Sequence, residues 1–204
     1  MSTIPDSAQN ADDALQRLKA GNARFVAGTA RFATVQKEIL ADLLKGQHPY
    51  ATILCCSDSR VPPELIFDAG FGELFIVRVA GNVLSPEIPG SLQYAGRHLH
   101  TPLFVVLGHT NCGAIAAAID THLRGTRHLS RIQLLIDSIL PALAALDPQL
   151  PPEALAGQAV EANVRWSMRQ ILETPEGRER QAEGRVKLAG AIYEIETGCV
   201  RFLA

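Results

Sequence analysis

Reactive side chains are concentrated in two short segments of this 204-residue sequence. The segments are CSDSR at 56–60 and GHTNCG at 108–113, and each directly follows an apolar run. Together they supply two thiols and one imidazole, from Cys56, Cys112 and His109. Two thiolates and an imidazole are the ligand chemistry of zinc with a fourth position left open, whereas a structural zinc is usually closed by four ligands. The set therefore favours a site that keeps a place for water.

The strength of this prediction depends on the three residues lying together. His109 and Cys112 sit on one turn by their spacing, but alone they are weak evidence, because a buried cysteine beside a capping histidine is more common. With Cys56 added, a metal site is favoured over this alternative, provided that the apolar runs before Cys56 and before His109 are neighbouring parallel strands. The carboxyl ends of such strands meet at the edge of the sheet where ligands bind.

A carboxylate and a guanidinium follow the first cysteine closely. Asp58 could accept the hydrogen of a zinc-bound hydroxide, and Arg60 could hold Asp58 through two hydrogen bonds and keep it ionised. The alternative is an ordinary salt bridge in a turn.

The rest of the chain reads as alternating strands and helices. Buried-strand runs at 51–56, 74–79 and 102–108 are separated by segments long enough for crossovers, at 62–70 and 86–100. This pattern predicts a parallel sheet covered on both faces.

Further elements are expected on either side of these strands. The expected elements are a polar tail at 1–11, a helix from about Asp12 interrupted by Gly21 and Gly28, a helix at 35–45, mostly helical structure at 113–146 broken near Gly125 and Pro141, a loop at 147–153, a long helix at 153–173, and a last strand with a hairpin turning at Thr197-Gly198.

Composition excludes several classes of protein. With 47% hydrophobic and 20% charged residues the chain is globular, and a net charge of -2 without a basic block argues against nucleic acid or an anionic membrane as partner. No apolar run approaches the roughly 18 residues of a membrane span, and the first thirty residues lack a signal peptide. We therefore expect a soluble, cytoplasmic protein. Cys55 and Cys199 are predicted to be core residues.

The sequence CSDSR followed by GHTNCG resembles the β-class carbonic anhydrases. The segments ALQRLKAGNARFVAG, RVPPELIFDAGFGELFIVRVAGNV, GSLQYA and LAGAIYEIETG resemble bacterial members, so the likeness covers roughly residues 12–204. It implies a single α/β domain over 1–204, with a mostly parallel central sheet, an antiparallel edge strand and helices on both faces. Residues 1–46 would form an N-terminal tail and helical arm, and 47–204 the zinc-binding core. The resemblance also implies a homodimer or a dimer of dimers.

The resemblance assigns roles to individual residues. It makes Cys56, His109 and Cys112 the ligands of one Zn²⁺ per chain, and Asp58 with Arg60 the catalytic pair. A closed state with Asp58 as the fourth ligand is left open. The residues that match substrate-contacting positions are Gln47, the Gly113 amide, Phe75 and Tyr94, the last two being supplied across the dimer interface in the family. The alternatives are a solvent-facing Gln47 and ordinary core aromatics.

The activity that the resemblance implies is the reversible hydration of carbon dioxide to bicarbonate and a proton by zinc-bound hydroxide. Two thiolates cancel the formal charge of the metal, so activity should rise into the alkaline range. Two alternatives remain. The same scaffold can hydrolyse carbon disulfide or carbonyl sulfide, or the zinc could be structural in a binding or scaffold module. Asp58 and Arg60 argue against the last alternative, because a structural site needs no such pair.

Overall fold

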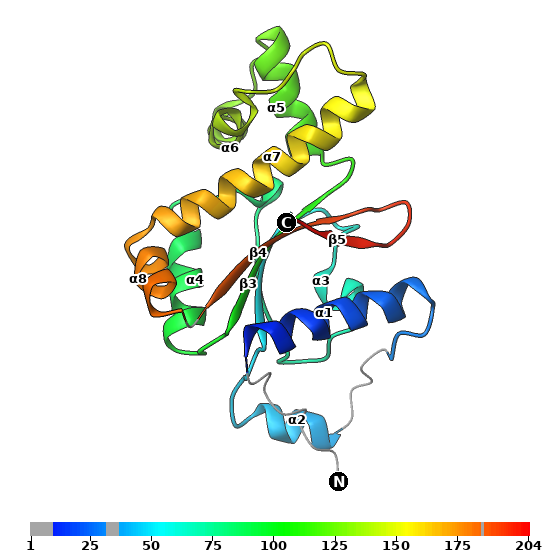
Figure 1. Ribbon diagram of the computed structural model, residues 1–204, viewed down its shortest axis with the longest axis vertical. Coiled ribbons are helices and arrows are strands. Elements are labelled where there is room, and N and C mark those ends of the chain that lie inside the picture. Colours follow the sequence, from blue (N-terminus) through cyan, green and yellow to red (C-terminus); the bar gives the residue numbers. More distant parts are fainter. Residues whose placement is uncertain (1–9, 32–36, 185) are drawn as a thin grey trace.

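The structure is a computed structural model that describes residues 10–31, 37–184 and 186–204 (Figure 1). The described residues form one five-stranded sheet with the spatial order β2-β1-β3-β4-β5. The strands are β1 (Ala51–Cys55), β2 (Leu74–Arg78), β3 (Leu103–His109), β4 (Lys187–Tyr193) and β5 (Val200–Phe202). The first four are parallel and β5 runs antiparallel to β4. This confirms the predicted mostly parallel sheet with an antiparallel edge strand.

Helices cover both faces of the sheet, as predicted. They are α1 (Ala11–Val26), α2 (Lys37–Leu43), α3 (Pro63–Ile66), α4 (Ile88–Arg97), α5 (Gly113–Arg124), α6 (Ser130–Ile139), α7 (Pro152–Glu173) and α8 (Pro175–Glu183), with 3₁₀ turns η1 (Ala80–Asn82) and η2 (Leu140–Leu143). Figure 1 shows α1 and α7 on opposite sides of the strands.

The alternation of side chains along the strands divides the core into two clusters. In β1, Leu54 packs into a cluster with residues of α4, α5, α6 and α7. Its neighbours Ile53 and Cys55 pack on the other face, with residues of α1 and α3. All five residues of β1 are buried, which explains the continuous apolar run in the sequence.

The N-terminal helix differs from expectation at one glycine. Gly21 does not interrupt α1 but lies inside it, where a Cβ atom would come within 1.9 Å of the carbonyl oxygen of Phe67. Glycine is required there by the close approach of α1 to the chain after α3. Gly28 follows the end of the helix with φ +67°. Residues 1–9 of the predicted tail and the predicted helix start at 35 lie outside the described residues.

The C-terminal half follows the prediction with two differences. Gly125 ends α5 with φ +68° and Pro141 lies in η2, so both predicted breaks are confirmed. Helix α8, capped by Thr174, was not predicted. Cys55 is a core residue with no exposed surface, but Cys199 is exposed in the chain between β4 and β5, so the prediction that it packs in the core is wrong.

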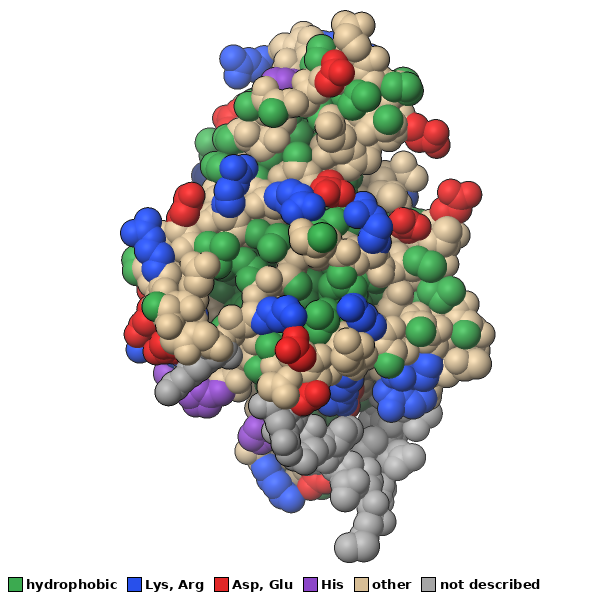
Figure 2. Space-filling view, in the orientation of Figure 1, with side chains coloured by type: hydrophobic (Ala, Val, Ile, Leu, Met, Phe, Trp, Pro, Cys, Tyr) green, Lys and Arg blue, Asp and Glu red, His purple; other side chains and the backbone are tan. Residues whose placement is uncertain are grey.

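The surface carries charges of both signs, spread over the face seen in Figure 2 without a block of one sign. Among the described residues, no helix combines the length and the apolar character that crossing a membrane would require.

Candidate metal centre and active site

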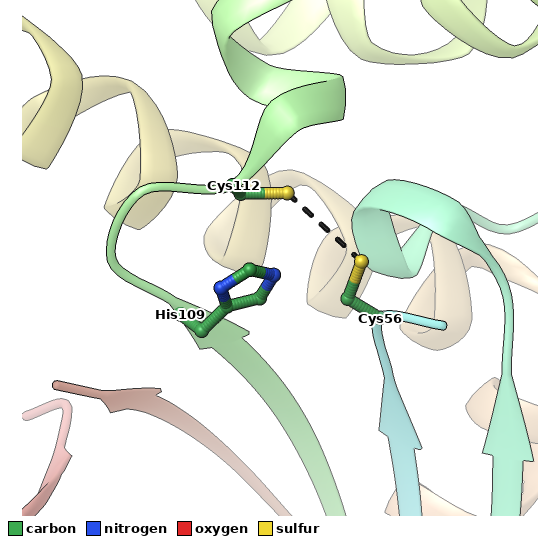
Figure 3. A group of neighbouring side chains, drawn as sticks. All are labelled: Cys56, His109 and Cys112. Carbon is green, nitrogen blue, oxygen red and sulfur yellow. Dashed lines mark hydrogen bonds between the residues drawn. The ribbon is translucent and has the colours of Figure 1, made fainter. Parts of the chain in front are cut away.

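The sheet brings the two reactive segments together. Strands β1 and β3 are parallel neighbours, with Cys55 opposite Leu107, so the residues that follow each strand emerge side by side. Cys56 directly follows β1, His109 is the last residue of β3, and Cys112 precedes the first turn of α5. Their side chains point toward one another (Figure 3), and their ligand atoms lie within 4.8 Å of one another. The two sulfur atoms are 4.0 Å apart.

His109 presents one nitrogen to this cluster. Its Nδ1 atom lies 2.9 Å from the carbonyl oxygen of Thr110, which can only accept a hydrogen bond, so Nδ1 carries the proton. The lone pair is therefore on Nε2. His109 is completely buried, and Nε2 has no hydrogen-bond partner among the described residues. A buried polar atom without a partner is costly, and a metal ion would satisfy it.

The two thiols differ in acidity. Hydrogen bonds from Cys112 and from the backbone N–H of Gly81 outweigh burial and lower the pKa of Cys56. The pKa of Cys112 is raised by the hydrogen bond to Cys56 and by burial. Cys56 is thus the more acidic thiol of the two, and the Gly81 amide nitrogen lies 3.3 Å from its sulfur.

The donor set fits zinc. Tetrahedral bonds of about 2.3 Å would place two sulfurs about 3.8 Å apart, close to the 4.0 Å between Cys56 and Cys112. Soft thiolates with one imidazole favour zinc over magnesium or calcium. Three buried ligand atoms leave one tetrahedral position for another group.

The loop that joins His109 to Cys112 is held by the end of β4 and the residues that follow it. The backbone N–H of Thr110 donates to the Tyr193 carbonyl oxygen at 3.0 Å, and its hydroxyl oxygen accepts from the N–H of Ile195 at 3.0 Å. Asn111 has φ +56°, a left-handed conformation that asparagine tolerates well. This turn brings Cys112 back toward His109.

Asp58 and Arg60 form the pair expected from their spacing. Arg60 donates from Nε to Oδ1 at 2.9 Å and from Nη2 to Oδ2 at 2.7 Å. Arg60 also donates to the carbonyl oxygen of Asn111 at 3.1 Å, and so links the two reactive segments. These bonds from Arg60 hold the pKa of Asp58 well below its usual range. The carboxylate oxygen Oδ2 lies 3.9 Å from Nε2 of His109.

The other predicted site residues are placed differently. Gly113 is the first residue of α5, and a Cβ atom on it would meet nothing within 4 Å. Gln47 is exposed in the chain before β1, at the end of that strand opposite Cys56. Phe75 lies in β2 opposite Thr52, and Tyr94 lies on α4 with 47% of its surface exposed. The structure therefore does not bring Gln47, Phe75 or Tyr94 to the metal ligands of their own chain.

Two contacts of the reactive segments were not predicted. The first is made by Arg78, which donates to the carbonyl oxygen of Cys56 at 3.1 Å and to that of Asp58 at 2.6 Å. The second is the hydrogen bond from the Gly81 amide to the sulfur of Cys56. The dipeptide Gly81-Asn82 is a turn signal in the sequence. No local sequence pattern reveals that a backbone N–H of this turn donates a hydrogen bond to the sulfur of Cys56.

Comparisons with known proteins agree with this geometry. The sequence profile of the carbonic anhydrase family matches residues 51–200. Carbonic anhydrase 2 of Mycobacterium tuberculosis is 35% identical over 187 residues, which are 91% of this chain and 89% of that protein. Among solved structures, a β-carbonic anhydrase of the fungal pathogen Aspergillus fumigatus is 28% identical with a TM-score of 0.75, covering 90% of this chain and 88% of that chain. One of two tetrameric β-carbonic anhydrases of Sordaria macrospora shares the fold, at 23% identity and a TM-score of 0.76, covering 91% and 94%.

Proposed function

This chain belongs to the β class of the carbonic anhydrase family, and on that premise we propose that it hydrates carbon dioxide reversibly to bicarbonate and a proton. Cys56, His109 and Cys112 would hold one zinc ion per chain. The observation that carries the proposal is the buried Nε2 atom of His109. It has no partner among the described residues, and it faces two thiols and a carboxylate.

Zinc, when bound, lowers the pKa of a water molecule and so supplies hydroxide near neutral pH. Asp58 is ionised at that pH, so it accepts hydrogen bonds and donates none. At Oδ2 it accepts the hydrogen of the attacking hydroxyl group, which leaves an oxygen lone pair directed at the carbon of carbon dioxide. Because both oxygens of Asp58 are held by Arg60, the carboxylate keeps this orientation.

Gly113 is proposed to position the substrate. It is the first residue of a 12-residue helix. The first backbone N–H groups of a helix have no partner within the helix, and the positive end of the helix dipole lies there. The open space beside its Cα atom lets a substrate oxygen approach the amide. A partial negative charge that develops on that oxygen during attack would be stabilised there.

We further propose that Gln47, Phe75 and Tyr94 serve the metal centre of a second copy of the chain, in a homodimer or a dimer of dimers. The five residues of β1 span about 16 Å, and they separate Gln47 from Cys56 in the same chain. Phe75 and Tyr94 lie together, with ring centroids 6.1 Å apart, and Tyr94 is half exposed. Gln47 and Tyr94 are thus exposed, and Phe75 lies partly buried beside Tyr94.

The division into an arm at 1–46 and a core at 47–204 belongs to the same proposal. Within the arm, α1 packs through Ala14 and Leu18 on the sheet of its own chain. Contacts with a neighbouring copy would then come from the exposed face of α1 and from α2. A cytoplasmic location is also proposed, since the cysteines are free thiols and zinc ligation by thiolates suits a reducing compartment.

The test is stopped-flow hydration of carbon dioxide from neutral to alkaline pH, on protein of known zinc content. One zinc per chain and turnover that rises with pH would support the proposal. Full zinc without hydration at any pH would contradict it. In that case, assays with carbon disulfide and carbonyl sulfide would distinguish a sulfur substrate from a structural metal.

A further inference from the structure

Two buried polar side chains of α7 hold the turn that contacts Cys56. The Nδ2 atom of Asn163 donates to the carbonyl oxygen of Gly81 at 2.8 Å. The hydroxyl group of Ser167 donates to the carbonyl oxygen of Asn82 at 3.0 Å. Asn163 and Ser167 are 1% and 0% exposed, and their spacing of four residues places them on one face of the helix. The helix thus satisfies two consecutive buried carbonyl groups of η1.

The backbone of this turn is left-handed at two successive residues. Gly81 has φ +69° and Asn82 has φ +44°, two left-handed residues in succession. Such a conformation persists where the surroundings determine it. Besides the two bonds from α7, the Asn82 N–H donates to the Val79 carbonyl oxygen at 3.0 Å.

The turn is also closely packed against the metal site. A Cβ atom on Gly81 would lie 2.9 Å from Cδ1 of Ile139 and 3.2 Å from Cβ of Ala114, which is the second residue of α5. The backbone of Gly81 therefore has little room to shift. Its N–H points at the sulfur of Cys56, at 3.3 Å.

Asn163 makes only part of the hydrogen bonds its buried amide group could make. Its Oδ1 atom is buried and has no hydrogen-bond partner among the described residues. The unpaired oxygen offsets part of the stability that the bond from Nδ2 to the Gly81 carbonyl oxygen contributes. The contact that the amide does make is to the residue whose N–H reaches Cys56.

We propose that Asn163 and Ser167 are positioning residues of the metal centre, which act by aiming the Gly81 N–H at the Cys56 sulfur. A hydrogen bond to a thiolate draws electron density from the sulfur and fixes its direction before the metal arrives. The two side chains thereby set how tightly Cys56 holds zinc and how much charge it donates. This inference rests on the proposed function, since it requires Cys56 to be a zinc ligand.

The test compares Asn163→Ala and Ser167→Ala with Met168→Ala, a matched control on the same helix whose sulfur packs near Gly190 of β4. Two properties are measured: the zinc dissociation constant, by competition with a chelator, and the thiolate-to-metal charge-transfer bands of the cobalt-substituted protein. Each of the two substitutions is expected to weaken zinc binding about 10-fold, at the lower end for residues that support ligands. The charge-transfer bands should move to lower energy, because a sulfur without its hydrogen bond donates more readily.

Met168→Ala should lose stability without moving the bands. Ser167→Ala, which removes only a hydroxyl group from the same face of α7, keeps the test decisive if Asn163→Ala does not fold. Folded variants with wild-type affinity and wild-type bands would overturn the inference, as would an equal shift in Met168→Ala. A wild-type protein that binds neither zinc nor cobalt at Cys56 would overturn the proposed function as well, so the two failures are distinguishable.

Discussion

The Nε2 atom of His109 and the Oδ2 atom of Asp58 lie 3.9 Å apart, beyond the length of a hydrogen bond. The other nitrogen of the ring, Nδ1, donates a hydrogen bond to the Thr110 carbonyl oxygen. Arg60 donates hydrogen bonds to both carboxylate oxygens of Asp58. The ligand nitrogen and the carboxylate therefore border the same space without bonding to each other. Because separate groups hold them, substitutions can remove the metal-binding role and the substrate-orienting role independently.

Cys56→Ser is expected to remove zinc and carbon dioxide hydration together. A hydroxyl group at this position is a poor replacement for a thiolate ligand, and two ligands do not hold zinc in the tetrahedral geometry of such sites. Zinc content after dialysis and stopped-flow turnover measure the effect. Cys55→Ser is the matched control: Cys55 is adjacent and also buried, but it packs on the opposite face of the sheet. Cys55→Ser should lower the free energy of unfolding and leave the zinc content at one ion per chain. Full zinc and full activity in Cys56→Ser would refute the ligand assignment.

Asp58→Asn is expected to keep zinc and to lose turnover by about 100-fold or more, the scale of positioned acid–base groups. The amide retains the shape of the side chain but presents an N–H donor where the proposal needs an acceptor. Turnover and zinc content are measured on the same preparation, with Ser59→Ala at the exposed neighbouring position as control. Unchanged turnover in Asp58→Asn would remove Asp58 from the mechanism.

Asp68 is expected to contribute to stability in a pH-dependent way. Burial raises the pKa of Asp68, but hydrogen bonds from Arg24 and Arg31 outweigh burial and hold the pKa below its usual value. Its contribution is therefore complete above the unfolded-state pKa of about 3.9, and it is lost as pH falls through the folded-state pKa. Asp68→Asn should lower the free energy of unfolding at pH 7 by about 2 kcal/mol, the scale of a hydrogen bond to a charged group.

Urea denaturation of wild-type protein and Asp68→Asn over a series of pH values measures this effect. The difference between the two proteins should shrink as the pH falls through the acid range. Asp120→Asn is the control, because the Asp120–Arg124 pair is exposed and such pairs contribute about 0–1 kcal/mol. A constant difference between wild type and Asp68→Asn at all pH values would show that the charge of Asp68 is not responsible.

Gly21→Ala should destabilise the protein by about 1–3 kcal/mol or more, as added atoms in a packed core do, because its Cβ would overlap the Phe67 carbonyl oxygen. Gly157→Ala is the matched control, since Gly157 lies inside α7 and a Cβ there meets nothing within 4 Å. That substitution should stabilise the protein by about 0.5–1 kcal/mol through helix propensity alone. Thermal unfolding of both variants is the measurement. Equal melting temperatures would mean that α1 is not held against Phe67.

The group of three metal ligands was predictable because the sequence patterns that indicate it are local. Apolar runs mark β1 and β3, and parallel neighbours bring Cys56 and His109 to the same edge whatever the details of the helices between them. The spacing from His109 to Cys112 then decides that both can reach one point. The contact between Asp58 and Arg60 followed from proximity along the chain.

The features that could not be predicted depend on contacts between distant segments. Gly21 reads as a helix breaker until α1 is placed against Phe67, which lies 46 positions further along the chain. Asn163 reads as an ordinary helix residue until α7 crosses the turn at Gly81. Cys199 was expected in the core, but it belongs to the connection before the short strand β5, where its side chain is exposed.

The proposed exchange of Gln47 between copies predicts complementation. Gln47→Ala should keep zinc and lower turnover, because the substrate loses a hydrogen-bond donor while the ligands are untouched. Asp58→Asn is inactive for a different reason, within its own site. In a mixed dimer of the two variants, one of the two sites combines an intact Asp58 from one chain with an intact Gln47 from the other. Random mixing in a twofold-symmetric dimer should therefore recover about one quarter of wild-type turnover.

The measurement is stopped-flow hydration after the two variants are unfolded and refolded together, compared with each variant refolded alone. Recovery requires Gln47 to act across the interface, because within one chain β1 separates it from Cys56. A mixture with no more activity than the average of the two variants would place Gln47 outside the active site of the partner. The same mixing with Tyr94→Ala in place of Gln47→Ala tests the aromatic pair independently, since Tyr94 lies on α4 and is half exposed.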